Sequence, residues 1–143
     1  MRYVVATDGS EPSLKAARFF VEHSCPGPDD EIFVIYVFPL PTDVDCYEGV
    51  VSLPTHATDE RVVEVSRPIL AETVEVFADA GCQVNDVAMV GNPAKEIVEF
   101  AMNLGVDLVV AGTRGRSSAT EHFLGSVSSA LAHRAPCSVL IVR

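Results

Sequence analysis

The sequence predicts an α/β fold: a single open sheet of five parallel strands with helices on both faces. Short β-branched and apolar runs alternate with segments of helical periodicity from one end of the chain to the other. Glycines, prolines and short polar clusters separate these runs, as is typical of turns and loops. Strands that alternate with helices pair in parallel through right-handed crossovers, which places helices on both faces of the sheet. The length of 143 residues fits one domain, residues 1–143.

The first strand is expected at Arg2–Thr7, and the polar turn Asp8–Ser10 ends it. A helix follows, with Pro12 in its first turn, where the missing N–H group costs nothing. After a loop over residues 25–30, the second strand is expected at Ile32–Phe38. This run is apolar throughout, which predicts a strand that is covered on both faces.

The middle of the chain is less regular. We expect Pro39–Asp59 to form an irregular insertion, the most mobile part of the chain, which closes over the binding site. The next helix is predicted to bury one face, formed by Val62, Val65, Ile69, Val76 and Ala80. Pro68 is expected to kink this helix or to place its start after Ser66. The third strand is expected at Gln83–Val90.

A further helix is expected from Pro93, capped by Asn92, to a stop at Gly105. The fourth strand follows at Asp107–Ala111, where the run DLVVA is short and rich in valine.

The last two elements are a helix at Val127–Arg134, which Pro136 ends, and a fifth strand at Ser138–Val142. We expect this fifth strand to form an edge of the sheet. An exposed apolar edge promotes aggregation unless another chain or element covers it.

Charge is distributed unevenly along the chain. The formal net charge is −10 at pH 7. Residues 1–112 hold nineteen Asp/Glu and six Lys/Arg, a net charge of −13, whereas residues 113–143 hold one Glu and four Arg, a net charge of +3. The acidic part argues against a nucleic-acid partner, which requires a basic surface. The basic part indicates that a small anion is held locally.

Other sequence features narrow the class of protein. The four cysteines and four histidines are scattered and form no CxxC pair, so we expect no metal site. No apolar run approaches the roughly 20 residues that span a membrane, so no membrane partner is expected. The start of the chain lacks the apolar region of a signal peptide, which predicts a cytoplasmic protein.

The segment GTRGRSSATEHFLGS, residues 112–126, carries the clearest chemical signal. Its glycines lack a Cβ, so backbone N–H groups can approach an oxyanion closely and φ can be positive. Gly125 and Ser126 open the next helix, whose first N–H groups and dipole favour a phosphate. The hydroxyl groups of Ser126 and Ser128 and the side chains of Arg114 and Arg116 are candidate donors. The spacing is neither that of a P-loop nor that of a G-x-G-x-x-G motif.

Ligands of open α/β sheets bind beyond the carboxyl ends of the strands, where the strand order reverses. Asp8 follows the first strand and Gly112 follows the fourth, so both would face one crevice if these strands are neighbours. An Asp-Gly pair after a strand can also simply cap the next helix, and for Asp8 both interpretations stay open on this ground.

The sequence resembles the universal stress protein family over essentially its whole length. The matching pieces, in chain order, are VVATDGSEPS (Val4–Ser13), YVFP (Tyr36–Pro39), GNPAKEI (Gly91–Ile97), DLVVAGTRGR (Asp107–Arg116), LGSVSSAL (Leu124–Leu131) and APCSVLIVR (Ala135–Arg143). The ATP-binding branch of the family has the motif G-x-x-G, nine residues, then G-[ST]. Gly112, Gly115, Gly125 and Ser126 fit this motif with its spacing intact. Ser117 and Ser118 depart from it, because many relatives have further glycines there.

The resemblance implies a Rossmann-like fold, of the adenine nucleotide alpha hydrolase-like type, with strand order 3-2-1-4-5. It also implies that Asp8 binds the ribose, that the backbone of Val37 contacts adenine, and that Gly112 abuts the ribose and α-phosphate. Gly115, Arg116, Gly125, Ser126 and Val127 would then hold the phosphates. The complete set of residues expected at the nucleotide is Ala6, Thr7, Asp8, Val37, Gly112, Arg114, Gly115, Arg116, Gly125, Ser126, Val127 and Ser128.

The function predicted from these observations is that of a stress-response regulatory protein that binds ATP, ADP or AMP, with Mg²⁺ bound through the phosphates. The resemblance implies a homodimer through Ser138–Val142, and an additional protein partner is left open. No catalytic residue is assigned, because the segment holds no nucleophile–base pair, and at most weak ATP hydrolysis is expected. Two alternatives are an ATP-dependent enzyme with slow hydrolysis or transfer activity, and a structural dimer without nucleotide.

Overall fold

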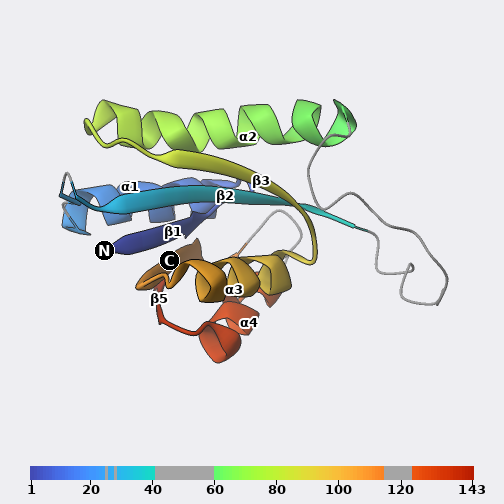
Figure 1. Ribbon diagram of the computed structural model, residues 1–143. Coiled ribbons are helices and arrows are strands. Elements are labelled where there is room, and N and C mark those ends of the chain that lie inside the picture. Colours follow the sequence, from blue (N-terminus) through green and yellow to red (C-terminus); the bar gives the residue numbers. More distant parts are fainter. Residues whose placement is uncertain (25, 28, 41–59, 115–123) are drawn as a thin grey trace, which may run out of the picture.

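The computed structural model describes residues 1–24, 26–27, 29–40, 60–114 and 124–143. Its five strands form one parallel sheet in the order β3-β2-β1-β4-β5 (Figure 1). The strands are β1 (Arg2–Ala6), β2 (Glu31–Pro39), β3 (Asn85–Gly91), β4 (Leu108–Gly112) and β5 (Ser138–Val142). Both the predicted fold class and the strand order are confirmed, and β5 forms an edge of the sheet as expected.

Four helices cover the two faces of this sheet (Figure 1). They are α1 (Glu11–Ser24), α2 (Glu60–Asp79), α3 (Pro93–Leu104) and α4 (Ser126–Arg134). Buried side chains of α1 and α2 pack on one face of the sheet, and those of α3 and α4 pack on the other. The central strand β1 contributes to both layers, because its alternate side chains point to opposite faces.

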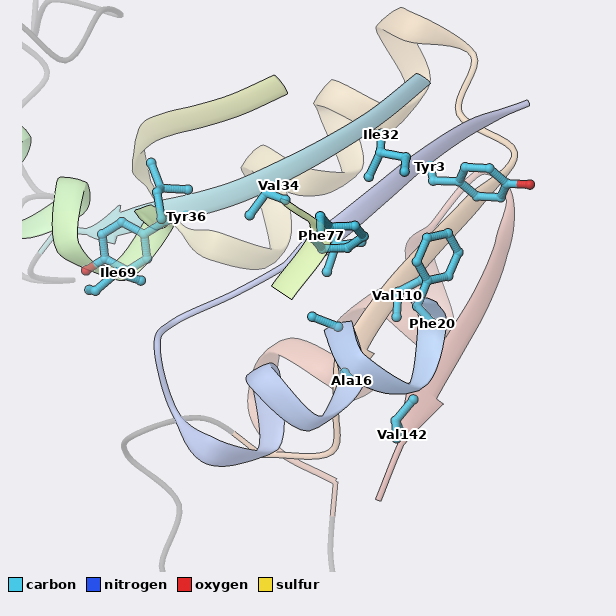
Figure 2. Packing of buried hydrophobic residues seen from close by; sticks show 13 residues of the cluster. Tyr3, Ala16, Phe20, Ile32, Val34, Tyr36, Ile69, Phe77, Val110 and Val142 are labelled. Carbon is cyan, nitrogen blue, oxygen red and sulfur yellow. The ribbon is translucent and has the colours of Figure 1, made fainter. Parts of the chain in front are cut away.

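The core under α1 and α2 contains most of the buried aromatic side chains (Figure 2). Phe20 of α1 lies between Tyr3 of β1 and Phe77 of α2, with ring centroids 5.0 Å and 6.2 Å away. Phe20 and Phe77 are fully buried. Side chains of this size contribute about 1.5–3 kcal/mol each through burial, so they fix both helices on the sheet.

The structure corrects the prediction for α2. This helix begins at Glu60 and contains Pro68, so it does not start after Ser66. Pro68 lies on the exposed side, where water can satisfy the carbonyl group that loses its N–H partner. The buried face also differs from the expected one, since Val65 is 40% exposed and Ala80 lies beyond the helix end. The observed buried residues are Val62, Ser66, Ile69, Leu70, Thr73 and Phe77.

Other elements agree with the sequence more closely. The α3 helix is capped by Asn92, whose side-chain oxygen accepts the N–H of Lys95 at 3.1 Å, and Pro93 opens the helix. Gly105 ends it in the left-handed conformation, with φ of 61°. Pro39, expected in the insertion, is the last residue of β2, and residues 41–59 lie outside the described part of the chain.

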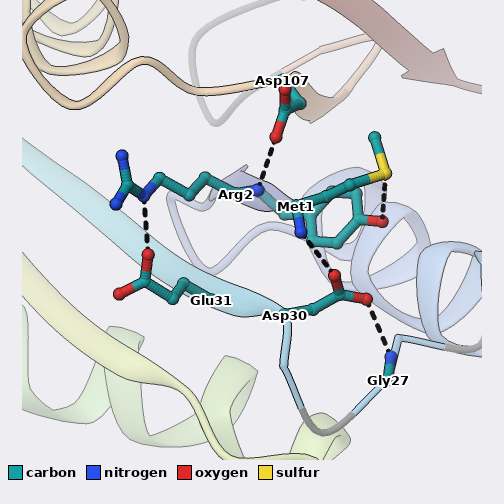
Figure 3. A network of polar contacts seen from close by, with 7 residues as sticks. Met1, Arg2, Gly27, Asp30, Glu31 and Asp107 are labelled. Carbon is teal, nitrogen blue, oxygen red and sulfur yellow. Dashed lines mark hydrogen bonds and ion pairs between the residues drawn. The ribbon is translucent and has the colours of Figure 1, made fainter.

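Charged side chains gather at the amino end of the sheet (Figure 3). The Arg2 guanidinium pairs with Glu31 at 2.6 Å, and these residues are register partners of β1 and β2. The Arg2 backbone N–H donates to Asp107 at 2.7 Å, and the Met1 amino group pairs with Asp30 at 2.6 Å.

Within the described ranges, no helix combines the length and the apolar character that a membrane crossing requires.

Candidate functional site

A cleft of about 710 Å³ lies at the carboxyl ends of β1, β2 and β4. From β1 the chain proceeds outward to β2 and β3, whereas β4 and β5 lie on the other side. The strand order therefore reverses between β1 and β4, and the cleft occupies this switch point. An open α/β sheet is expected to bind its ligand at this position.

Ten of the twelve residues expected at the nucleotide line this cleft. They are Ala6, Thr7, Asp8, Val37, Gly112, Arg114, Gly125, Ser126, Val127 and Ser128. The other two, Gly115 and Arg116, lie outside the described residues. The ten come from the ends of three strands and the start of one helix, so the fold brings together four separate stretches of the sequence.

One part of the cleft lining was not predicted from the sequence. Asn92, Pro93, Ala94 and Ile97, at the start of α3, line the cleft as well. The sequence does indicate this position for them. Asn92 and Pro93 start a helix directly after the third strand, so the helix start lies at the carboxyl edge of the sheet. The other missed residues are Ser13, Tyr36, Pro39, Ala111, Leu124, Ala130 and Arg134.

Asp8 lies at the cleft and also organises the turn after β1. Its Oδ1 accepts the backbone N–H of Ser10 at 3.0 Å and the Ser10 hydroxyl group. Gly9 between them has φ of 72°, a conformation that side chains rarely adopt. These bonds close the turn before α1, which begins at Glu11, and they hold one carboxylate oxygen at the cleft.

Gly112 is required by packing as well as by its place in the cleft. A Cβ at this position would lie 2.5 Å from the carbonyl oxygen of Pro12 and 3.0 Å from the backbone nitrogen of Ser13. The first turn of α1 therefore packs directly on the end of β4, and only glycine leaves room for it. The motif predicted this glycine for its approach to a ligand, and the structure adds a reason that lies in the fold.

Gly125 precedes α4 in an extended conformation, with φ of −63°, so a positive φ does not explain this glycine. Its N–H donates to the Thr113 carbonyl at 2.7 Å. A Cβ here would lie 3.2 Å from that carbonyl oxygen and 3.3 Å from Cα of Arg114. Space against the end of β4 is therefore what favours glycine.

Ser128 has a structural contact that the sequence did not predict. The residue is 3% exposed, and its hydroxyl group donates to the Thr113 carbonyl at 2.8 Å, with the Gly125 carbonyl 3.0 Å away. A hydroxyl group has one hydrogen, so donation to a phosphate would require Ser128 to give up this bond. The bond joins the start of α4 to the end of β4.

The start of α4 can nevertheless bind an anion through its backbone. The first helical hydrogen bond runs from the Ser129 N–H to the Gly125 carbonyl, so the N–H groups of Ser126, Val127 and Ser128 have no acceptor inside the helix. They lie at the cleft together with Arg114, and the helix dipole adds partial positive charge. This part of the cleft is suited to a phosphate group.

The fold and the cleft define a doubly wound, Rossmann-like α/β protein with an open cleft at its topological switch point. The chain belongs to the universal stress protein family, whose model matches residues 1–143.

Two relatives and one solved structure illustrate the similarity. Universal stress protein YxiE of Bacillus subtilis strain 168 is 36% identical over 146 residues, covering 99% of this chain and 98% of that protein. Universal stress protein MJ0531 of Methanocaldococcus jannaschii is 32% identical over 146 residues, covering 99% and 81%. The structure of a universal stress protein in complex with cAMP matches with a TM-score of 0.73 at 26% identity, covering 100% of this chain and 97% of that one.

Proposed function

We propose that the protein is a stress-response regulatory protein that binds ATP, ADP or AMP in this cleft. The observation that carries the proposal is the convergence of ten predicted residues from four stretches of the chain on one cleft. Its volume of about 710 Å³ lies within the range of about 300–1,000 Å³ that small-molecule sites occupy. The similar structure in complex with cAMP supports an adenine nucleotide as the ligand.

The lining of the cleft fits the parts of such a ligand. Val37 and Ile97 are buried apolar residues that suit the base, and Asp8 suits the ribose hydroxyl groups. The free N–H groups at the start of α4, with Arg114, suit the phosphates, and Mg²⁺ would bind through those phosphates. From the sequence alone, Gly115 and Arg116 are assigned to the phosphates as well.

Regulation rather than catalysis is the proposed role. Among the lining residues that the structure describes, Asp8 is the one carboxylate, and none is histidine, lysine or cysteine. Asp8 holds Ser10 at the turn after β1, and the lining residues that the structure describes include no nucleophile paired with a general base. We therefore expect occupancy by the nucleotide, with hydrolysis that is slow at most, to carry the signal.

The test compares nucleotide binding by the wild type and by Gly125→Val. A β-branched side chain would displace the Thr113 carbonyl and the start of α4, and so move the phosphate-binding N–H groups. At 100 times its dissociation constant, ATP with Mg²⁺ should stabilise the wild type by about 2.7 kcal/mol in thermal unfolding. Gly125→Val should remain folded and lose almost all of this stabilisation.

Gly27→Val is the matched control, because Gly27 lies at the amino end of the sheet and a Cβ there meets no atom closer than 3.8 Å. It should keep the full nucleotide effect. Equal stabilisation of wild type and Gly125→Val would show that phosphates bind elsewhere. No stabilisation of the wild type, with no nucleotide detected by mass spectrometry after denaturing the purified protein, would favour a structural dimer without nucleotide.

We also propose that the protein is a homodimer in which two copies of β5 meet. The support is that β5 is an edge strand whose central residues Val139, Leu140 and Ile141 are only partly buried. An apolar edge of this kind needs a cover. Analytical ultracentrifugation at micromolar concentration should give a dimer, and a monomer in both low and high salt would contradict the proposal.

A further inference from the structure

Three buried hydroxyl groups link α2 to the turn that carries Asp8. The Thr73 hydroxyl of α2 lies 2.8 Å from that of Thr7, which follows β1. The Thr7 hydroxyl lies 3.2 Å from that of Ser13 in α1, and the Ser13 hydroxyl lies 2.8 Å from the Ser10 carbonyl oxygen. We call this series, from Thr73 to Ser10, the hydroxyl chain. Its three hydroxyl residues are at most 6% exposed, and Thr73 is fully buried.

The hydrogen bonds can run in one direction along this series. When Ser13 gives its one hydrogen to the Ser10 carbonyl, it accepts from Thr7. Thr7 has then used its own hydrogen and accepts from Thr73, whose hydroxyl group has the Ile69 carbonyl, 3.3 Å away, as its other acceptor. The second lone pair of Thr7 accepts the N–H of Gly9 at 3.2 Å. Each hydroxyl group thus donates once, and in a buried setting each bond polarises the next.

The hydroxyl chain ends at the residue that holds the Asp8 carboxylate. Ser10 donates both its backbone N–H and its hydroxyl group to Oδ1 of Asp8. The Ile69 side chain of α2 lies beside the same turn, so that a Cβ added at Gly9 would be 3.3 Å from it. The α2 helix therefore packs close to the Asp8 turn and reaches it through the hydroxyl chain.

We propose that Thr73 is a positioning residue for Asp8: through the hydroxyl chain it orients the carboxylate that binds the ribose. No α2 residue is among the described residues that line the cleft, so Thr73 acts through Thr7, Ser13 and Ser10 rather than on the ligand. The inference rests on the proposed function, because it assigns Asp8 to the ribose hydroxyl groups. The inference assigns to Thr73, in a helix outside the cleft, an effect on selectivity for the ribose hydroxyl groups.

The experiment measures selectivity for the ribose hydroxyl groups, using calorimetric dissociation constants for AMP and for 2′,3′-dideoxy-AMP. The wild type should prefer AMP by about tenfold to a hundredfold, the range for hydrogen bonds to a charged group. Thr73→Val keeps the shape of the side chain and removes the hydroxyl group. It should lower this preference to about threefold or less, with little change in affinity for the dideoxy analogue.

Two variants separate positioning from a general loss of structure. Thr73→Ser keeps the hydroxyl group and should restore most of the preference for AMP. Ser66→Ala removes the other buried hydroxyl group of α2, whose oxygen has no hydrogen-bond partner in the described part of the chain, and should leave the preference unchanged. Circular dichroism would establish that each variant is folded at the temperature of measurement.

The inference and the proposed function fail in different ways. If Thr73→Val keeps the full preference for AMP, or weakens both ligands equally, Thr73 does not position Asp8 and the proposed function is unaffected. If the wild type binds neither ligand, the proposed binding of AMP is wrong and the inference falls with it. If the wild type binds AMP but Asp8→Asn keeps the preference, the ribose role of Asp8 is wrong and the inference falls, while nucleotide binding stands.

Discussion

The two ends of β1 are held by different kinds of polar contact. At the amino end, charged groups pair at the surface: the side chains of Arg2 and Glu31 are 48% and 52% exposed. At the carboxyl end, the hydroxyl groups of Thr7 and Thr73 meet in the interior and are 6% and 0% exposed. A charged pair at the surface therefore need not constrain the fold more than a neutral pair of hydroxyl groups in the interior.

Solvent explains this difference. Water can replace either partner of an exposed ion pair, so such pairs contribute little to stability. A buried hydroxyl group that loses its partner finds no other, and the cost is about 1–3 kcal/mol. The exposed pair of register partners at the amino end, Arg2 and Glu31, therefore constrains the fold little, whereas the buried contacts at the carboxyl end hold a more precise geometry.

The largest effect is expected for Gly112→Ala at the carboxyl end. The added methyl group would lie 2.5 Å from the Pro12 carbonyl oxygen, so the first turn of α1 must move away from β4. We expect the free energy of unfolding to fall by about 3 kcal/mol, the upper part of the usual range for overpacking. Urea denaturation measures this as a lower midpoint with an unchanged slope.

The matched control at the amino end is Gly27→Ala. Its methyl group would lie 3.8 Å from Oδ2 of Asp30, which is an ordinary contact distance. The free energy of unfolding should stay within about 0.5 kcal/mol of the wild type. A similar loss in both variants would show that the two ends of the sheet tolerate added volume equally, and would remove the packing argument for Gly112.

A smaller effect is expected for Ser128→Ala, also at the carboxyl end. This variant loses the buried bond to the Thr113 carbonyl, which keeps the Gly125 N–H as a donor. No group is left without a partner there, so the free energy of unfolding should fall by about 1 kcal/mol.

Ser126→Ala is the comparison for Ser128→Ala, because Ser126 is exposed at the start of the same helix. Its stability should change by less than about 0.5 kcal/mol. Thermal or urea unfolding of both variants measures the difference. An equally small change for Ser128→Ala would mean that its hydroxyl group is available to a ligand after all, as the sequence suggested.

Most of the fold follows from local patterns in the sequence. Alternating apolar runs and helical periodicity gave the order of the elements, and the cap and stop of α3 at Asn92 and Gly105 were placed correctly. Strand order came from family resemblance rather than from the pattern. The buried face of α2 was predicted incorrectly because it includes the polar residues Ser66 and Thr73, and Thr73 meets its hydrogen-bond partner Thr7 across 66 positions of sequence. A hydropathy pattern cannot contain such a partner.

The lining of the cleft was predicted where the chain itself carries the signal. Strand ends and the glycine motif identified ten lining residues, but not the reasons for them. The packing of Pro12 against Gly112 and the use of the Ser128 hydroxyl by Thr113 both depend on segments that meet only in the folded chain. The start of α3 was not predicted, because Asp8 and the glycines indicate only the ends of β1 and β4, although the end of β3 lies at the same edge of the sheet.

The smallest effect on stability is expected for Asp30→Asn at the amino end. The pH dependence of the melting temperature distinguishes this effect from a change in shape. The hydrogen bond from the Met1 amino group, and then that from the Gly27 N–H, lower the pKa of Asp30. A lowered pKa contributes stability above the ordinary aspartate value, about 3.9, and this contribution is lost as the pH falls through the folded value. The same hydrogen bond raises the pKa of the Met1 amino group. That contribution is complete below the ordinary amine value, about 7.7–8.0, and is lost as the pH rises through the folded value. The melting temperature of the wild type should therefore exceed that of Asp30→Asn most between about pH 5 and 7, and the gap should narrow on both sides and in high salt. Asp29→Asn, which removes the neighbouring exposed charge, should show no such window. A gap that persists unchanged below pH 3 would mean that Asp30 acts through its shape and not through its charge, and the two ends of β1 would then differ less than their chemistry indicates.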